Sequence, residues 1–328
     1  MKAKFTNTVH IEGLLYEHDL VMKTTGPNSK APNTEFITGT IKVATDDNIT
    51  NVVEVHYTYV TKKTAKGSNN DTFTNLKSII DGSVMCYMNG KGKENYNPCF
   101  VRIDTAIGLN DFYSENNGQV ELVSPKRNEG GFLHFIRENE LKPELDERGN
   151  NARNNFKADM IITNIRRVEP DEEKGLPEKM VVKGVIFDFR RGILPAEFTM
   201  YNPKGMELFE SQEPSPNNPF CTEIRGTQIS MTTMIRQEEP SAFGPAIVRE
   251  YPRTRKEYEI TSIFNQISYP WDDEGFITAE ELRKAMGDRE TYLATVKQRY
   301  DEYQASRNAP AATSSTTTNS VKAGGFNF

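Results

Sequence analysis

Stretches of alternating apolar and polar residues dominate positions 8–258, and they constrain the fold more than any other feature of the sequence. In NVVEVHYTYVT, one face of the alternation carries Val53, Val55, Tyr57 and Tyr59. This pattern, rich in β-branched and aromatic residues, is typical of strands that bury one side. We therefore expect a mainly β protein.

The order of the expected elements repeats. Three strands, a short helix and a further strand are predicted within residues 8–136 and again within 157–258. The first helix is DTFTNLKSIIDG, with apolar residues at helical spacing, and the second is NPKGMELFES. Gly39 interrupts a strand in the first set as Gly184 does in the second. The sequence therefore predicts two domains built on one plan.

Composition divides the rest of the chain. Residues 137–156 are charged and Asn-rich, residues 279–307 have an apolar stripe at nearly heptad spacing, and the last residues are of low complexity. We expect a first β domain at 1–136, a charged linker or excursion at 137–156, a second β domain at 157–258, an extension with a long helix at 259–307, and a disordered tail at 308–328.

The segment WDDEGFITAEEL resembles the second half of a calcium-binding EF-hand loop, with Gly275 as the central glycine and Glu281 as the last ligand. Counting back from Gly275 puts Pro270 at the first ligand position, where its side chain cannot bind a cation. Thr278 and Glu281 also have the spacing of a capping box. The pattern favours a capped helix start over a calcium site.

Composition and motifs argue against several classes of protein. The chain has 328 residues, a net charge of -6, three cysteines and four histidines. The cysteines form no CxxC pair, which indicates a reducing compartment, and neither a signal peptide nor a membrane-spanning run is evident. No catalytic or metal-binding motif is present. We expect a cytoplasmic protein that is not an enzyme and that needs no metal or cofactor.

Aromatic residues stand beside basic residues at the ends of several expected strands. Single-stranded nucleic acid is bound by this combination, because aromatic rings stack on bases and cations follow the phosphates. The candidate DNA-binding residues are His56, Tyr57, Tyr59, Lys62, Lys63, Lys66, Arg102, Phe112, Tyr113, Phe187, Phe189, Arg190, Arg191, Tyr201, Arg225, Arg253 and Arg255.

Each of these aromatic residues can instead pack in a core. Tyr57 and Tyr59 share a face, so both should stack or both should pack. Because Val53 and Val55 on that face prefer the core, the favoured contacts from this strand are the polar residues of its other face and the loop Lys62–Lys66.

Five strands with a helix between the third and the fourth are the order of an OB-fold. From VHIEGLLYEHDL and EFITGTIKVATDDNITNVVEVHYTYV to KMVVKGVIFDF and FCTEIRGTQIS, the chain resembles bacteriophage single-stranded DNA-binding proteins with tandem OB-folds. The resemblance covers roughly residues 8–258. It implies two OB-type Greek-key barrels in tandem, a long C-terminal helix, and sequence-tolerant binding of single-stranded DNA during phage replication or recombination.

Proteins of this family often recruit replication partners through a tail with acidic residues and a terminal Phe. Here the tail ends in Phe326-Asn327-Phe328 but has no acidic residue after Glu302, which leaves hydrophobic docking to the two phenylalanines. A β-rich phage structural or assembly protein that oligomerises through the long helix is the alternative function. A subunit of a nucleic-acid enzyme with its catalysis on a partner is a further one, and the oligomeric state stays open.

Overall fold

The computed structural model describes residues 5–171, 176–188, 192–239 and 247–308. The strands are β1 (Asn7–His18), β2 (Val21–Thr24), β3 (Glu35–Ala44), β4 (Val52–Thr61), β5 (Phe100–Leu109), β6 (Phe112–Asn116), β7 (Gln119–Val123), β8 (Lys126–Ile136), β9 (Asn154–Val168), β10 (Lys179–Phe187), β11 (Ile193–Met200), β12 (Phe220–Glu239) and β13 (Ile247–Tyr269). The helices are α1 (Asp71–Ile80), α2 (Tyr87–Gly90), the short 3-10 helix η1 (Glu138–Glu140), α3 (Pro203–Ser211) and α4 (Ala279–Asn308). The protein is mainly β, as the alternation predicts.

The first barrel closes through the pairings β1–β5, β5–β8, β8–β4, β4–β3 and β3–β1. The β4–β8 pairing is parallel and the others are antiparallel. Helix α1 connects β4 to β5 and buries Phe73, Leu76 and Ile79. This strand order, with a helix between the third and fourth barrel strands, is that of an OB-fold.

The second barrel repeats the plan through β9–β10, β10–β11, β11–β13, β13–β12 and β12–β9. Again one pairing, β11–β13, is parallel, and α3 stands between the third and fourth strands. Glycine is required at position 184 in β10, because a Cβ there would lie 2.0 Å from the Ile161 carbonyl oxygen. The prediction of two OB-type barrels with a long C-terminal helix is confirmed.

The fifth strand of each barrel, β8 and β13, was not among the expected strands. Strand β8 contains Gly130-Gly131 and charged residues, which hide its alternation. Strand β13 runs to Tyr269 and crosses the boundary expected at residue 258. Its first half pairs with β12 as a ribbon that carries Arg, Lys and Glu side chains, so its sequence shows no apolar face.

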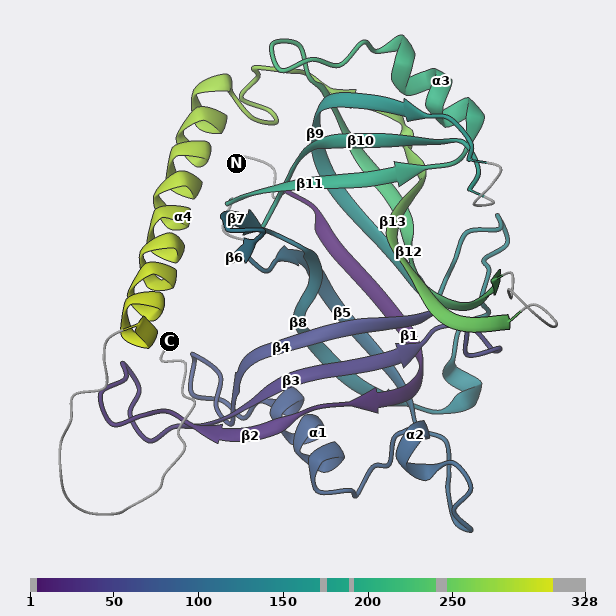
Figure 1. The fold of residues 1–328 in the computed structure, drawn as a ribbon, viewed down its shortest axis with the longest axis vertical. Coiled ribbons are helices and arrows are strands. Elements are labelled where there is room, and N and C mark those ends of the chain that lie inside the picture. The colour runs from purple at the N-terminus through teal and green to yellow at the C-terminus, as the bar shows by residue number, and fades with distance from the viewer. Residues whose placement is uncertain (1–4, 172–175, 189–191, 240–246, 309–328) are drawn as a thin grey trace.

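The two barrels are joined by their first strands. The first half of β1 pairs with the first half of β9, from Asn7 opposite Ala158 to Ile11 opposite Asn154. The barrels therefore share one eleven-stranded sheet. The β12–β13 ribbon also reaches the first barrel, where Met231 forms an isolated bridge with Asn51. Figure 1 shows the barrels stacked along the long axis with this ribbon crossing between them.

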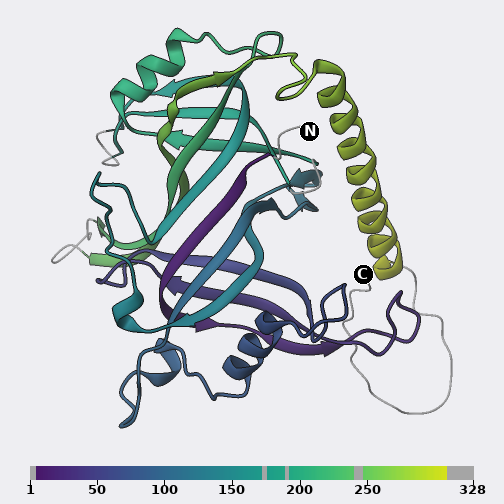
Figure 2. The ribbon, with the colours of Figure 1, turned by 180° about the vertical axis from the view of Figure 1, so that it is seen from behind.

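Helix α4 packs on its own chain. Its start is held by the predicted capping box, which is confirmed, since Thr278 N–H donates to Glu281 Oε2 (3.1 Å) and Glu281 N–H donates to Thr278 Oγ1 (3.2 Å). Phe276 and Ile277, just before it, are buried against the second barrel. Figure 2 shows α4 running beside both barrels.

The middle of α4 is tied to the segment after β5. Arg289 Nη2 lies 2.8 Å from Asp111 Oδ1, and the rings of Tyr113 and Tyr300 are 6.2 Å apart. Within the part of the chain that the structure describes, no helix is long and apolar enough to cross a membrane. The tail expected at 308–328 lies, beyond Asn308, outside the described residues.

Candidate nucleic-acid interface

Two adjoining cavities form a groove where the barrels meet. The junction cavity, about 440 Å³, is lined by Val53, Glu54, His56, Asn110, Pro125, Lys126, Arg127, Asn128, Gln228, Ile229, Ser230, Lys256, Glu257 and Tyr258. The ribbon cavity, about 820 Å³, is lined by Val168, Glu169, Asp171, Leu176, Pro177, Lys179, Tyr201, Met231, Thr233, Ile235, Arg253, Thr254, Arg255, Lys256 and Glu257. They share Lys256 and Glu257, so they adjoin along β13, and together they reach from β4 to the β12–β13 ribbon.

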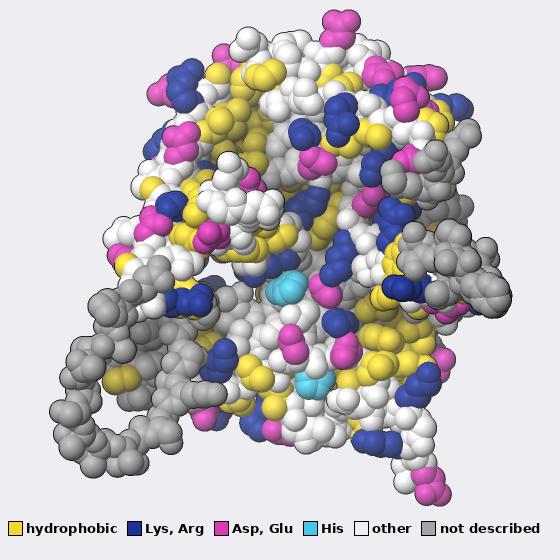
Figure 3. All heavy atoms as spheres, in the orientation of Figure 1, with side chains coloured by type: hydrophobic (Ala, Val, Ile, Leu, Met, Phe, Trp, Pro, Cys, Tyr) yellow, Lys and Arg dark blue, Asp and Glu magenta, His cyan; other side chains and the backbone are white. Residues whose placement is uncertain are grey.

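Basic side chains gather along this groove. In Figure 3, Lys and Arg side chains lie across the middle of the face, between the two barrels, with acidic groups among them. Two cations that line the junction cavity form ion pairs: Arg127 Nη2 lies 2.7 Å from Glu129 Oε1, and Lys256 Nζ lies 2.9 Å from Glu54 Oε2. Burial and the nearby Arg127 charge lower the pKa of His56, so its imidazole adds no full charge at neutral pH.

The ribbon cavity contains a carboxylate held by several donors. Tyr201 Oη donates to Glu257 Oε2 (2.6 Å), and Arg255 and Lys179 form ion pairs with the same carboxylate. Burial alone would raise the pKa of Glu257, but these hydrogen bonds outweigh it and lower that pKa to about 2. The Arg255 guanidinium also lies 4.8 Å from the centre of the Tyr201 ring. Glu257 thus orders the basic and aromatic groups on one wall of the groove.

Four of the predicted residues line the groove: His56, Tyr201, Arg253 and Arg255. Lys126, Arg127 and Lys256 also line the junction cavity but were not among the residues predicted from the sequence. The Lys-Arg pair after Pro125 was a usable signal, because it begins a strand, but that strand was itself missed.

Two predicted contacts are wrong because their side chains are in the core. Tyr57 is 2% exposed and Phe187 is 1% exposed. The Tyr57 ring faces the first barrel's interior with Val53 and Val55, and Phe187 stacks on Phe5 with ring centres 3.8 Å apart. Neither ring has a face that a base can reach.

The expectation that Tyr57 and Tyr59 act alike is also wrong. Tyr57 lies opposite Gly39 and Val60 opposite Ile37, so two residues of β4 face one residue of β3 in a β-bulge. The bulge breaks the alternation, and Tyr59 is 45% exposed. Its ring leans against Phe36, with centres 4.8 Å apart.

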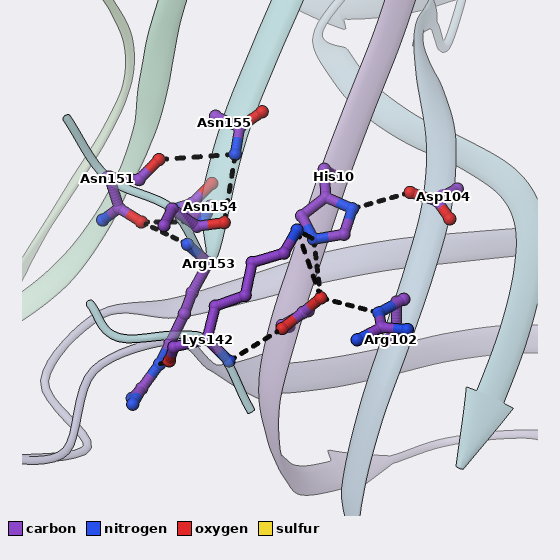
Figure 4. Close-up of polar contacts among 10 residues, drawn as sticks. His10, Arg102, Asp104, Lys142, Asn151, Arg153, Asn154 and Asn155 are labelled. Atoms are coloured by element: carbon purple, nitrogen blue, oxygen red, sulfur yellow. Dashed lines mark hydrogen bonds and ion pairs between the residues drawn. The ribbon is translucent and has the colours of Figure 1, made fainter. Parts of the chain in front are cut away.

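Arg102 is engaged in a polar cluster on the outer face of the first barrel (Figure 4). Its Nε donates to Glu12 Oε1 (2.6 Å), and the Glu12 side chain is fully buried. Lys142 contributes its backbone N–H (3.1 Å) to the other carboxylate oxygen and its Nζ lies 3.4 Å from Oε1. The cluster attaches residues 137–153 to β1 and β5, so Arg102 has a structural role.

The other candidates that the structure describes lie outside the groove. Lys62, Lys63 and Lys66 are exposed in the loop after β4, and Lys63 Nζ donates to Asn69 Oδ1 (2.7 Å). Phe112 and Tyr113 belong to the hairpin β6–β7, and Tyr113 faces α4. Arg225 Nε donates to Glu223 Oε1 (2.8 Å). Phe189, Arg190 and Arg191 lie outside the described residues.

The groove offers cations, amides and aromatic rings and is suited to holding a polyanion. Among the residues that the structure describes, no group of three or more His, Cys, Asp or Glu side chains could hold a metal ion.

Comparisons with known proteins identify the family of the chain. The family model named YorF matches residues 6–299, which include both barrels and most of α4. No curated protein gives a significant sequence match. Among solved structures, the chain is similar to the crystal structure of a deletion mutant of the single-stranded DNA binding protein from Thermus aquaticus. The TM-score is 0.41 at 10% identity, covering 81% of this chain and 98% of that chain.

Proposed function

The chain belongs to the YorF family, and we propose that it binds single-stranded DNA in the groove between its two barrels, with little regard to sequence. The observation that carries this proposal is the groove, whose two adjoining cavities are lined by His56 on β4 and by Arg253 and Arg255 on β13. An OB-fold alone does not define a ligand, because such barrels also bind oligosaccharides.

The groove favours a polyanion over a neutral sugar chain. Lys126, Arg127 and Lys256 line its junction cavity, and Lys179, Arg253 and Arg255 line its ribbon cavity. Cations that follow a phosphate backbone beside aromatic rings are the usual means of holding a single strand without reading its bases. The lining also contains the carboxylates of Glu54, Glu169, Asp171 and Glu257, so six cations against four anions leave two excess positive charges in a chain of net charge -6.

The role that fits such binding is protection of single strands during DNA replication or recombination of a phage. The support is the sequence resemblance to tandem-barrel phage proteins together with the groove. In this role the protein binds and shields the strand, and catalysis is left to partners.

A titration with poly(dT) and with duplex DNA at several salt concentrations tests the proposal. We expect tight binding of poly(dT) at low salt, a steep loss of affinity with added salt, and weaker binding of the duplex. Equal affinity for duplex, or no binding of poly(dT) at low salt, would overturn it.

Self-association through α4 is a second candidate function. Met286, Tyr292 and Tyr303 on this helix are each about half exposed, although other residues of α4 pack on the chain itself. If the protein is an assembly protein, size-exclusion chromatography gives a stable oligomer whose elution does not change with added oligonucleotide. A change in elution with the oligonucleotide supports the first function.

A further inference from the structure

Lys126 reaches from the first barrel to two aromatic rings of the second. It is the first residue of β8, and its Nζ lies 4.8 Å from the centre of the Phe198 ring and 5.0 Å from that of Tyr258. Phe198 is on β11 and Tyr258 is on β13, so both rings belong to the second barrel. The lysine therefore lies where the two barrels meet, in the wall of the junction cavity.

Lys126 differs from its basic neighbours because it has no carboxylate partner. Arg127 pairs with Glu129 and Lys256 pairs with Glu54, whereas no described acidic group lies within ion-pair distance of Lys126. The two acidic groups that attract it at longer range are already engaged, Glu197 with Lys183 and Glu257 with Arg255 and Lys179.

A lysine with most of its side chain out of water is usually paired. Burial lowers the pKa of Lys126 to about 8, against the weaker attraction of Glu197 and Glu257. The ring faces of Phe198 and Tyr258 attract its ammonium but offer no charge to balance it. Lys126 lines a cavity that is also lined by the polar residues Asn110 and Ser230.

We propose that the junction cavity is a phosphate site, in which Lys126 contacts one backbone phosphate of the bound strand as it passes from the first barrel to the second. A phosphate supplies the negative charge and the acceptor oxygens that this lysine lacks. Arg127 and Lys256 provide further positive charge beside it. This inference rests on the proposed function and assigns one of its contacts.

The first test compares the salt dependence of poly(dT) binding for the wild-type chain, Lys126→Met and Lys77→Met. Methionine removes the charge with little change in length. Lys77 is a matched control, because it is a lysine on α1 that pairs with Asp81 and lines neither cavity. Loss of one phosphate contact lowers the slope of log affinity against log salt by about 0.7 for a single strand. We expect that change in Lys126→Met and none in Lys77→Met.

The second test is the pH profile of binding between pH 7 and 9. The free lysine loses its charge in this interval and a bound phosphate keeps it charged, so affinity should fall about tenfold with rising pH. The other charged or titratable groups around it are Glu54 and His56 on β4, Arg127 on β8, Glu197 on β11, and Lys256, Glu257 and Tyr258 on β13. The pKa of His56 is lowered, that of Tyr258 is raised and that of Glu257 is about 2, so these three stay outside the interval.

Lys126→Arg keeps the charge and should keep the salt slope while it removes the fall with pH. If Lys126→Met folds, binds and has the wild-type salt slope, the phosphate site is wrong although the proposed function stands. If Lys126→Met does not fold, Lys126→Arg decides, and a wild-type pH profile in that variant overturns the site. A wild-type chain that does not bind poly(dT) overturns the proposed function itself, and the phosphate site with it.

Discussion

Asn128 of the first barrel and Gln228 of the second exchange two hydrogen bonds through their side-chain amides. Asn128 Nδ2 donates to Gln228 Oε1 (2.8 Å), and Gln228 Nε2 donates to Asn128 Oδ1 (3.1 Å). Both residues are buried, at 2% and 4% exposure. Asn154 Nδ2 adds a bond to the Gln228 carbonyl oxygen (2.6 Å), so the ribbon is fixed against both barrels beside the groove.

Replacing one member of this pair should destabilise the fold. In Asn128→Leu, the buried Gln228 amide loses its partner, which costs about 1–3 kcal/mol of the free energy of unfolding. Urea denaturation measures this, with Asn116→Leu, at an exposed position of β6, as the control. A loss in Asn128→Leu no larger than in the control would show that the amide pair does not hold the barrels together.

Glu12 should make the free energy of unfolding depend on pH in the acid range. Burial would raise its pKa, but the hydrogen bond from Arg102, the Lys142 N–H and the charges of Lys142 and His10 outweigh burial and lower it below 4.5. Because the folded pKa is the lower one, this stabilisation is complete above about pH 4.5 and is lost as pH falls through the folded value.

Glu12→Gln should therefore lower the free energy of unfolding at pH 7 by about 2 kcal/mol, since the partly exposed Arg102 and Lys142 lose a charged hydrogen-bond partner. Below pH 4.5 the variant and the wild type should converge. Denaturation at a series of pH values checks this, with Glu121→Gln on the exposed strand β7 as the control. A constant difference at all pH values would contradict it.

Tyr57→Phe should leave DNA affinity unchanged and stabilise the protein by about 1 kcal/mol. The Tyr57 hydroxyl is buried without a hydrogen-bond partner among the described residues, so its removal relieves a desolvation cost. Tyr59→Phe changes an exposed tyrosine of the same strand and is the control, with no expected effect on stability. A fall in affinity in Tyr57→Phe would return this residue to the interface.

Substitutions of Arg253 and Arg102 should change different properties, DNA binding in the first case and the free energy of unfolding in the second. Arg253→Gln removes an exposed groove cation, so the salt slope of poly(dT) binding should fall by about 0.7 with no change in stability. Arg102→Gln removes a charged hydrogen bond to Glu12 and should cost about 2 kcal/mol in unfolding, with an unchanged salt slope. The opposite pattern, with Arg102 altering the salt slope, would place the interface on the outer face of the first barrel.

The barrels were predictable because most of their strands alternate apolar and polar residues, and because the order of strands and helices repeats. Strand β13 was not, since its stabilising partner is β12 along most of its length and its side chains are largely exposed. The different environments of Tyr57 and Tyr59 depend on one bulge, which arises from pairing with β3 and has no mark in the sequence of β4.

The groove was predictable only where residue type alone indicates the role of a side chain. His56, Tyr201, Arg253 and Arg255 have the residue types of a DNA interface and do line it. Arg102 has the same type but lies beside Glu12, a residue distant in sequence, which commits its charge to the fold. Lys126 could not be predicted, because its environment consists of two rings of the other barrel, Phe198 and Tyr258. Only the tertiary structure brings these residues together.

The antiparallel pairing of β1 with β9 has a consequence for the direction of a bound strand. These are the first strands of two barrels with the same topology, so antiparallel pairing relates the barrels by an approximate two-fold rotation. A nucleic acid strand has a 5′-to-3′ direction and no such symmetry. A strand running straight through the groove therefore meets the two barrels with opposite polarity, and the two halves of its path cannot make equivalent contacts.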